Sequence, residues 1–329
     1  MSSLQFGVGL FPTEPIPRMV ELGKQAENLG FSHVWVGDSH LIWREPFVNM
    51  AAIALNTSRV IIGTGVTNPI TRHPSVLAST YASLDELAPG RCAVGIGLGD
   101  SSLETMGLTQ ARMGHLQNAV TQMRAVIEGG EAELESGKIH LNFGRGEKIP
   151  FYFAASGPKM LELSGRVADG VIILVGVDSG ALDKALAKIE AGAKSAGRKL
   201  SDLHLVLWVP CAVSDRAHAK DAVKAHVARV VAHPLPFSLN QEEQKVLDDI
   251  RKAYNYYQHM DQKASQAEVI PDWLVDKFAI AGTSEECAAK VAELQATGIN
   301  QVAIIPYDVG EADRGETLRL FAKAAGMSG

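Results

Sequence analysis

The chain has 329 residues, of which 46% are hydrophobic and 21% charged, and its formal net charge at pH 7 is −6. This composition is typical of a globular protein with a sizeable core, and the lack of a basic surplus argues against nucleic acid as a partner. The apolar runs are far shorter than the ~20 residues of a membrane span, and the N-terminus has no secretory pattern. We therefore expect a cytoplasmic protein whose three cysteines, Cys92, Cys211 and Cys287, are reduced and buried.

Short apolar, β-branched runs alternate along the chain with longer amphipathic segments, the pattern of parallel strands joined by helices. Eight runs are predicted to be strands: 4–11, 33–36, 60–63, 92–97, 151–154, 170–174, 203–213 and 301–305. Helical patterns cover 19–29, 75–87, 116–127, 160–168, 181–196, 285–297 and 316–325. Eight such units predict an α/β fold, a (β/α)8 TIM barrel with insertions that spans residues 1–329 as a single domain.

Two segments are longer than a plain barrel needs. Residues 131–149 alternate polar and apolar side chains around Ser136-Gly137 and are predicted to form a hairpin before the fifth strand. Residues 215–277 exceed one connection and are predicted to form extra helices. Because insertions after barrel strands tend to cover the active face, we interpret 230–275 either as a lid or as a solvated helical addition or oligomer contact.

Polar side chains and glycines gather directly after four predicted strands, where the active sites of such barrels lie. The four groups are 36–40 (VGDSH), 65–68 (GVTN), 97–101 (GLGDS) and 155–160 (ASGPKM). Each group alone is weak evidence for a functional site, since a lone histidine such as His40 is more often structural and an aspartate such as Asp100 commonly caps a turn. Their coincidence at one end of the barrel predicts a shared cavity, and we predict no metal site.

The stretch SGPKM opens a predicted helix, and free N–H groups at a helix N-terminus bind phosphate. Four residues are therefore candidate phosphate ligands: Ser156, Gly157, Lys159 and Met160. The alternative is an ordinary turn with Pro158 at the first helical position. The segment lacks the G-x-G-x-x-G pattern of a dinucleotide site, and the glycines at 95, 97 and 99 have no evident acidic ribose partner.

Three stretches resemble the bacterial luciferase-like superfamily, and within it the methylenetetrahydromethanopterin reductase group. They are VIIGTGVTNPITRHPSVLASTYASLDELAPGRCAVGIGLGDSSLETMG, GPKMLELSGRVADGVII and FAIAGTSEECAAKVAELQATGINQVAII. The resemblance covers nearly the whole chain and is weakest across 215–270. It implies a TIM barrel that binds FMN or the deazaflavin coenzyme F420 at the C-terminal ends of its strands.

The resemblance also implies which residues hold the cofactor. In this family a non-prolyl cis peptide in the bulge after the third strand supports the isoalloxazine ring, and the matching bond here is Gly65-Val66. Without the resemblance, a wide bulge that aids barrel closure is the preferred interpretation. Further residues are assigned to the ring edge, the phosphate and the cofactor chain: Thr67, Asn68, Gly97, Gly99, Asp100, Ser156, Gly157, Lys159, Met160, Gly176 and Val177.

Asp38 and His40 are the candidate catalytic residues. Asp38 matches an acidic residue of the reductase group, whereas Ser39 stands where many relatives have His, with His40 one place later. A histidine beside a carboxylate suits acid or base work near pH 7; the alternative is that His40 only stacks near Trp43. Gly9 stands where methanopterin reductases carry a proton-donating Glu, so we expect a substrate other than methylene-tetrahydromethanopterin.

These features predict an oxidoreductase in which a flavin or deazaflavin supplies the chemistry. The first expectation is an FMN-dependent monooxygenase that acts on a small organic substrate and uses flavin reduced by a separate flavin reductase, because no pyridine-nucleotide site is visible. The alternatives are F420-dependent hydride transfer and a flavin-binding protein without turnover. We expect a homo-oligomer, and neither nucleic acid nor membrane as a partner.

Overall fold

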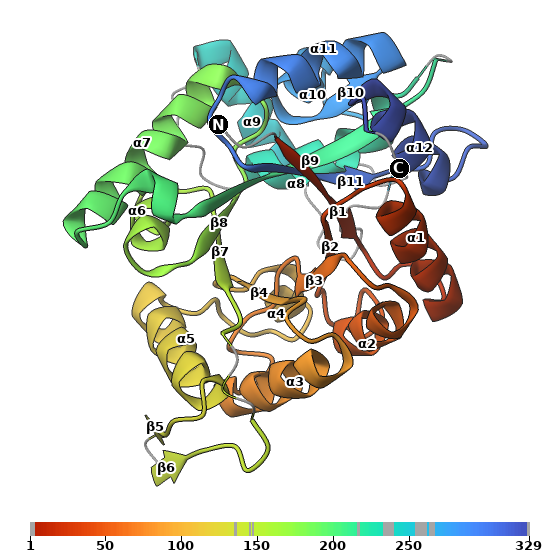
Figure 1. Ribbon diagram of the computed structural model, residues 1–329. Coiled ribbons are helices and arrows are strands. Elements are labelled where there is room, and N and C mark those ends of the chain that lie inside the picture. Colours follow the sequence, from red (N-terminus) through yellow and green to blue (C-terminus); the bar gives the residue numbers. More distant parts are fainter. Residues whose placement is uncertain are drawn as a thin grey trace.

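The computed structural model describes residues 4–134, 137–144, 146, 148–215, 218–232, 240–253, 262 and 267–327. Eight parallel strands of this described chain close into a barrel in the order β1-β2-β3-β4-β7-β8-β9-β11, and helices surround it (Figure 1). The predicted (β/α)8 TIM barrel is confirmed.

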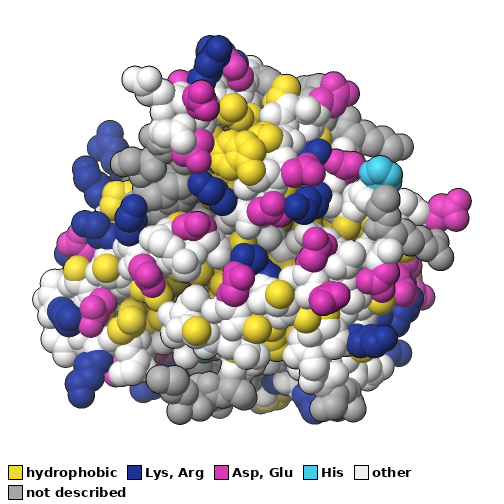
Figure 2. Space-filling model, turned by 90° about the horizontal axis from the view of Figure 1, so that it is seen from above, with side chains coloured by type: hydrophobic (Ala, Val, Ile, Leu, Met, Phe, Trp, Pro, Cys, Tyr) yellow, Lys and Arg dark blue, Asp and Glu magenta, His cyan; other side chains and the backbone are white. Residues whose placement is uncertain are grey.

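On the face seen in Figure 2, acidic and basic side chains intermingle.

Every predicted strand is present within one residue of its expected bounds. The barrel strands are β1 (Gln5–Leu10), β2 (His33–Val36), β3 (Ile61–Thr64), β4 (Cys92–Ile96), β7 (Phe151–Ala155), β8 (Gly170–Ile173), β9 (His204–Val213) and β11 (Gln301–Pro306). A short strand that we did not predict, β10 (Ile280–Gly282), pairs in parallel with β9 beside the barrel. With three residues, it is too short to give a periodic pattern.

The helices that surround the barrel include α1 (Ile16–Asn28), α2 (Pro46–Asn56), α3 (Pro74–Leu87), α4 (Ser101–Glu104), α5 (Met113–Ile127), α6 (Pro158–Val167), α7 (Ser179–Ser195), α11 (Ser284–Gln295) and α12 (Arg314–Ala324). Of these, α2 and α4 were not predicted. The α2 sequence PFVNMAAIALN is apolar nearly all round and lacks a polar stripe, and α4, with four residues, is too short to give a periodic pattern. None of the described helices is both long and apolar enough to cross a membrane.

Both predicted insertions contain the expected kinds of element. Within 131–149, β5 (Ala132–Leu134) and β6 (Gly137–Ile139) pair antiparallel and project from the barrel (Figure 1). Within 215–277, the described helices are α8 (Lys224–Ala232), α9 (Gln241–Ala253) and α10 (Asp272–Phe278). Residues 233–239, 254–261 and 263–266 lie outside the described residues, so the lid stays a prediction.

A polar and aromatic cluster fills the N-terminal end of the barrel, away from the strand ends that carry the site. Trp35 Nε1 donates to Gln301 Oε1 at 3.0 Å, and Gln301 Nε2 lies 2.7 Å from His33 Nδ1. The His33 ring stacks on Trp35 and on His204, with centroids 5.4 and 5.6 Å apart. Burial lowers the pKa of His33 to about 3 and also lowers the pKa of His204, so both imidazoles are neutral at pH 7.

We expect the barrel to lose stability as the pH falls below about 6.5. Because the pKa of His33 is lower in the folded chain, its contribution is fully present above its unfolded value of 6.5 and is lost as pH falls through that value toward about 3. One extra proton bound by the unfolded chain lowers the free energy of unfolding by about 1.4 kcal/mol per pH unit. Urea unfolding at pH 7, 6 and 5 measures the slope, and His33→Asn should flatten it; equal slopes would contradict the prediction.

Candidate functional site

A cavity of about 550 Å³ lies at the C-terminal ends of the barrel strands. Its walls come from the loops after β1, β2, β3, β4, β7 and β8, together with β9 and α8. Most of the predicted site residues line it: Asp38, Gly65, Val66, Thr67, Asn68, Gly97, Gly99, Asp100, Ser156, Gly157, Lys159 and Met160. The predicted convergence of four strand ends on one cavity is therefore what the fold produces.

The bulge after β3 forms one wall of the cavity. Its Gly65-Val66 bond is cis, which confirms that prediction. After the bulge the chain rejoins β4, because Thr67 N–H donates to Gly95 O and Gly97 N–H donates to Thr67 O, both at 2.9 Å. A Cβ atom at Gly65 would lie 2.5 Å from the Trp208 ring, so only glycine lets the bulge approach this indole.

Asn68 is buried and lines the cavity, as predicted, and it also holds its own loop. Its Oδ1 accepts hydrogen bonds from the N–H groups of Ile70 and Thr71, at 3.0 and 2.8 Å. Its Nδ2 donates to Ser102 Oγ at 3.2 Å, which ties the bulge to the start of α4. The amide therefore fixes the shape of the wall from which it projects.

Asp38 is buried at the cavity wall, and its two oxygens differ in their surroundings. Oδ2 accepts hydrogen bonds from Thr67 Oγ1 at 2.7 Å and from Arg72 at 2.5 Å. Oδ1 is buried and has no hydrogen-bond partner within the described part of the chain. Burial raises the pKa of Asp38, and Arg72 and Thr67 oppose this shift. The site thus holds one fixed oxygen and one free acceptor.

His40 is not brought to the cavity. Its side chain is exposed and is not among the residues that line the walls, and its carbonyl accepts a hydrogen bond from Thr105 Oγ1 at 3.1 Å. The prediction assumed that extended backbone continues past Asp38, but the chain turns at residues 40–42. Ser39 lines the cavity instead, with its Oγ 2.7 Å from Ser101 Oγ.

The N-terminus of α6 borders the cavity, as the candidate phosphate site requires. The N–H groups of Met160 and Leu161 donate to Gly157 O, at 3.1 and 3.0 Å. Those of Gly157 and Lys159 have no partner among the described residues. Two N–H groups beside the Lys159 ammonium therefore stay available to an anion.

Gly176 and Val177, predicted to line the cofactor chain, do not reach the cavity. Val177 N–H donates to Lys277 O at 2.8 Å. A Cβ atom at Gly176, whose φ is +82°, would lie 2.4 Å from the same carbonyl. These two residues pack the end of β8 against α10 instead.

The sequence of the chain matches a known family. The model of the luciferase-like monooxygenase family matches residues 2–301. The chain belongs to this family. A 5,10-methylenetetrahydromethanopterin reductase of Methanolobus tindarius is 31% identical to this luciferase-like chain over 309 residues, which cover 91% of this chain and 93% of the relative.

Two further comparisons extend the similarity. An F420-dependent glucose-6-phosphate dehydrogenase of Microbacterium testaceum is 33% identical over 227 residues, which cover 63% of this chain and 65% of the relative. The solved structure of a coenzyme F420-dependent tetrahydromethanopterin reductase from Methanopyrus kandleri has a TM-score of 0.81 and 25% identity, and the match covers 99% of this chain and 100% of that one. The protein is therefore an enzyme, an oxidoreductase of the luciferase-like family.

Several cavity residues of this luciferase-like enzyme were missed from the sequence. Trp208 projects from the middle of β9, and Phe11 stacks on Trp43 at 4.3 Å. His226 and Arg229 come from α8, inside the insertion. None of them belongs to a cluster of polar residues and glycines directly after a predicted strand. That clustering was the sequence pattern that identified the other cavity residues.

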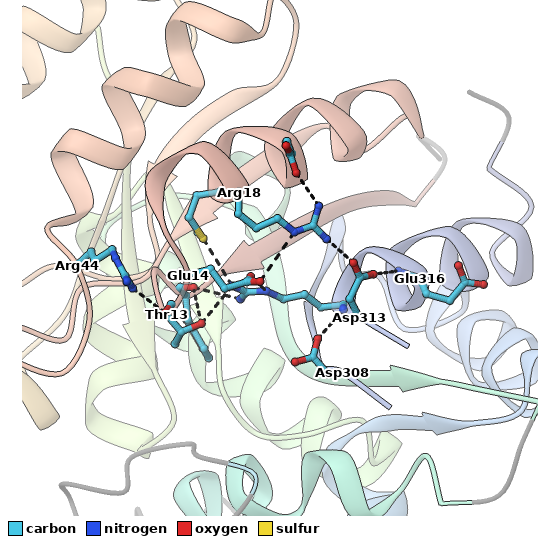
Figure 3. Close-up of polar contacts among 11 residues, drawn as sticks. Thr13, Glu14, Arg18, Arg44, Asp308, Asp313 and Glu316 are labelled. Atoms are coloured by element: carbon cyan, nitrogen blue, oxygen red, sulfur yellow. Dashed lines mark hydrogen bonds and ion pairs between the residues drawn. The ribbon is translucent and has the colours of Figure 1, made fainter. Parts of the chain in front are cut away.

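A polar network fixes the loop that carries Phe11 to the cavity (Figure 3). Arg314, at the start of α12, donates to Phe11 O at 3.1 Å and forms an ion pair with Glu14. Arg44 donates to Thr13 O at 2.6 Å, and both Thr13 and Glu14 lie inside the network of dashed contacts in the close-up. The loop after β1 is thereby held to α12 on one side and to the β2–α2 loop on the other.

We expect Gly157→Val to weaken binding of a phosphate-bearing cofactor by about tenfold or more, since it would crowd the N–H groups that are the predicted phosphate ligands. The fold should survive, because a Cβ atom at Gly157 meets no other atom within 4 Å. Cofactor affinity by fluorescence titration and the melting temperature test the two halves separately. Unchanged affinity would remove this loop from the site.

Proposed function

We propose that the protein is a coenzyme F420-dependent reductase or dehydrogenase that transfers hydride between F420 and a small organic substrate. The observation that carries this proposal is its similarity, over nine-tenths of the chain, to a methylenetetrahydromethanopterin reductase and to a solved reductase described as F420-dependent. The FMN-dependent monooxygenase, our first expectation, has weaker support: the descriptive name of the family, and solved monooxygenases that are only 20% and 17% identical to this chain, one of them in complex with FMN. The F420 alternative is therefore preferred.

The residues of the cavity suit such a cofactor. Val66, Leu174 and Trp208 give apolar walls for a flat ring system, in a volume of about 550 Å³. The α6 N-terminus, with Lys159 and the open space at Gly157, suits its phosphate. When bound, the deazaflavin supplies the two-electron chemistry, and the protein supplies binding, orientation and water exclusion.

Asp38 moves the proton that accompanies the reaction. Thr67 and Arg72 hold Oδ2, so the carboxylate keeps one orientation while Oδ1 stays free to accept a hydrogen bond from a substrate hydroxyl or amine. In the oxidation direction Oδ1 takes that proton, and in the reduction direction the protonated carboxyl returns it. The raised pKa of Asp38 brings it nearer to the working pH of such an acid or base.

The substrate differs from methylene-tetrahydromethanopterin. The relevant position on β1 is Gly9, where a Cβ atom would lie 2.6 Å from the Trp208 ring and 3.0 Å from Ile305. The indole therefore fills the space that a carboxylate on β1 would need. A proton donor from the first strand is incompatible with Trp208 in this position, which supports a different substrate.

Cofactor titration tests the proposal. Purified protein is titrated with F420 and with FMN, and oxygen uptake is followed after each reduced cofactor is added. We expect F420 to bind at least about tenfold tighter than FMN, a difference of about 1.4 kcal/mol, and reduced F420 to cause no oxygen uptake. Tighter binding of FMN together with substrate-dependent oxygen uptake would restore the monooxygenase.

A further inference from the structure

Arg229 lines the cavity, and its guanidinium makes fewer hydrogen bonds to the described residues than it has donors for. Its side chain is 8% exposed and lines the cavity from α8. Nη2 forms an ion pair with Asp100 Oδ2 at the end of β4. Nε and Nη1 are both buried and have no hydrogen-bond partner among the described residues. Within the described part of the chain, two donor nitrogens of a permanently charged group therefore have no acceptor.

This arrangement goes beyond what a structural ion pair needs. A guanidinium stays charged when buried, and an unpaired buried donor on a charged group is costly. Asp100 accepts a hydrogen bond from only one of the three guanidinium nitrogens of Arg229, Nη2. Arg314, which is equally buried, uses all three of its nitrogens, on Glu14, the Phe11 carbonyl and Thr13 Oγ1.

Arg229 and the candidate phosphate site line the cavity from different helices. His226, Arg229 and Val230 are spaced i, i+3 and i+4 and together line the cavity, so one face of α8 forms a wall. His226 Nδ1 lies 3.1 Å from Tyr307 Oη. The cation that this wall presents to the cavity is Arg229, whereas Lys159 and the free N–H groups belong to α6.

We propose that Arg229 binds an anionic group of the substrate, a carboxylate or a phosphate. Carboxylate and phosphate oxygens accept strong, charge-assisted hydrogen bonds from guanidinium N–H groups, and Nε and Nη1 of Arg229 each offer such a donor. The inference rests on the proposed function, because it assigns the anion site at α6 to the cofactor and leaves Arg229 to the second reactant. The substrate is then an anionic alcohol, aldehyde, ketone or imine rather than a neutral one.

Anion titrations test this assignment. Inorganic phosphate and acetate are titrated separately into cofactor-free and F420-loaded protein at constant ionic strength, and tryptophan fluorescence is read, since Trp43 and Trp208 line the cavity. The variants are Arg229→Gln, Asp100→Asn and Gly157→Val, the last of which removes the α6 site. Arg319→Gln is the matched control, because Arg319 is 57% exposed and pairs with Glu316 on the same helix.

Arg229→Gln and Asp100→Asn should change the affinity for anions in opposite directions. Arg229→Gln should weaken anion binding to F420-loaded protein by about tenfold to a hundredfold, the range for a charged hydrogen bond, and Arg319→Gln should not. Asp100→Asn should strengthen it, by about threefold or more, because the competing carboxylate is removed. If Arg229→Gln does not fold, as judged by circular dichroism, the result for Asp100→Asn decides.

Three outcomes would overturn the inference: equal anion affinity in wild type and Arg229→Gln, unchanged or weaker affinity in Asp100→Asn, or a loss of F420 affinity in Arg229→Gln as large as in Gly157→Val. The third would assign the guanidinium to the cofactor. Failure of F420 to bind the wild type, with Arg229-dependent anion binding intact in cofactor-free protein, would instead refute the proposed function and leave the anion site standing.

Discussion

Replacing Asp38 by asparagine should lower kcat/KM by about 10²-fold or more, whereas His40→Ala and His40→Gln should leave it within about threefold of wild type. Asp38 is buried at the cavity, and its Oδ1 has no hydrogen-bond partner among the residues that the structure describes, whereas His40 is exposed and outside the lining. The loss should fall mainly on kcat, because an amide can still accept the hydrogen bond from Thr67 but cannot take or give the proton.

The pH profile separates proton transfer from simple damage to the cavity. In the oxidation direction, wild-type activity should fall as the pH drops through the pKa of Asp38, which burial raises above its usual range. This acidic limb should be absent from the residual activity of Asp38→Asn. Cofactor affinity and melting temperature are measured beside it. A kcat within threefold of wild type, or a loss confined to cofactor affinity, would mean that the proton comes from another group.

The barrel, and the end of it that carries the site, could be predicted because the sequence patterns that indicate them are local. Each barrel strand is a short β-branched run with a clear boundary, and parallel strands bring their C-terminal ends together whatever the helices do. Residues that directly follow a strand, such as Asn68, Asp100 and Gly157, therefore converge on the cavity. The helix α2 escaped detection because its residues are apolar on most sides.

The rest of the site depends on backbone geometry and on distant packing that no local pattern encodes. His40 lies outside the cavity lining, because the chain turns at residues 40–42, and Ser39 lines the cavity instead. Arg229 belongs to an insertion whose placement over the barrel cannot be deduced from its periodicity. Trp208 sits mid-strand, and its only trace in the sequence is the pair of glycines, Gly9 and Gly65, that leave room for its ring.

Adding a single methyl group at Gly95 should be severely destabilising. A Cβ atom there would lie 1.9 Å from Thr64 O, a backbone atom that cannot rotate away. The carbonyl oxygen of Gly95 itself accepts hydrogen bonds from Thr64 Oγ1 at 2.6 Å and from Thr67 N–H at 2.9 Å. Gly95→Ala must therefore push β4 away from the bulge that forms the cavity wall, breaking contacts on both sides of it.

We expect Gly95→Ala to lower the free energy of unfolding by about 3 kcal/mol or more, the upper end of the cost of overpacking, and to weaken cofactor binding as the bulge shifts. Gly97→Ala is the matched control on the same side of the chain, because its Cβ would lie 3.2 Å from the Val66 side chain and 3.5 Å from that of Ala154, contacts that small shifts relieve. Urea unfolding of both variants measures the difference. Equal stability of the two would mean that the bulge does not need the close approach of Gly95 to Thr64.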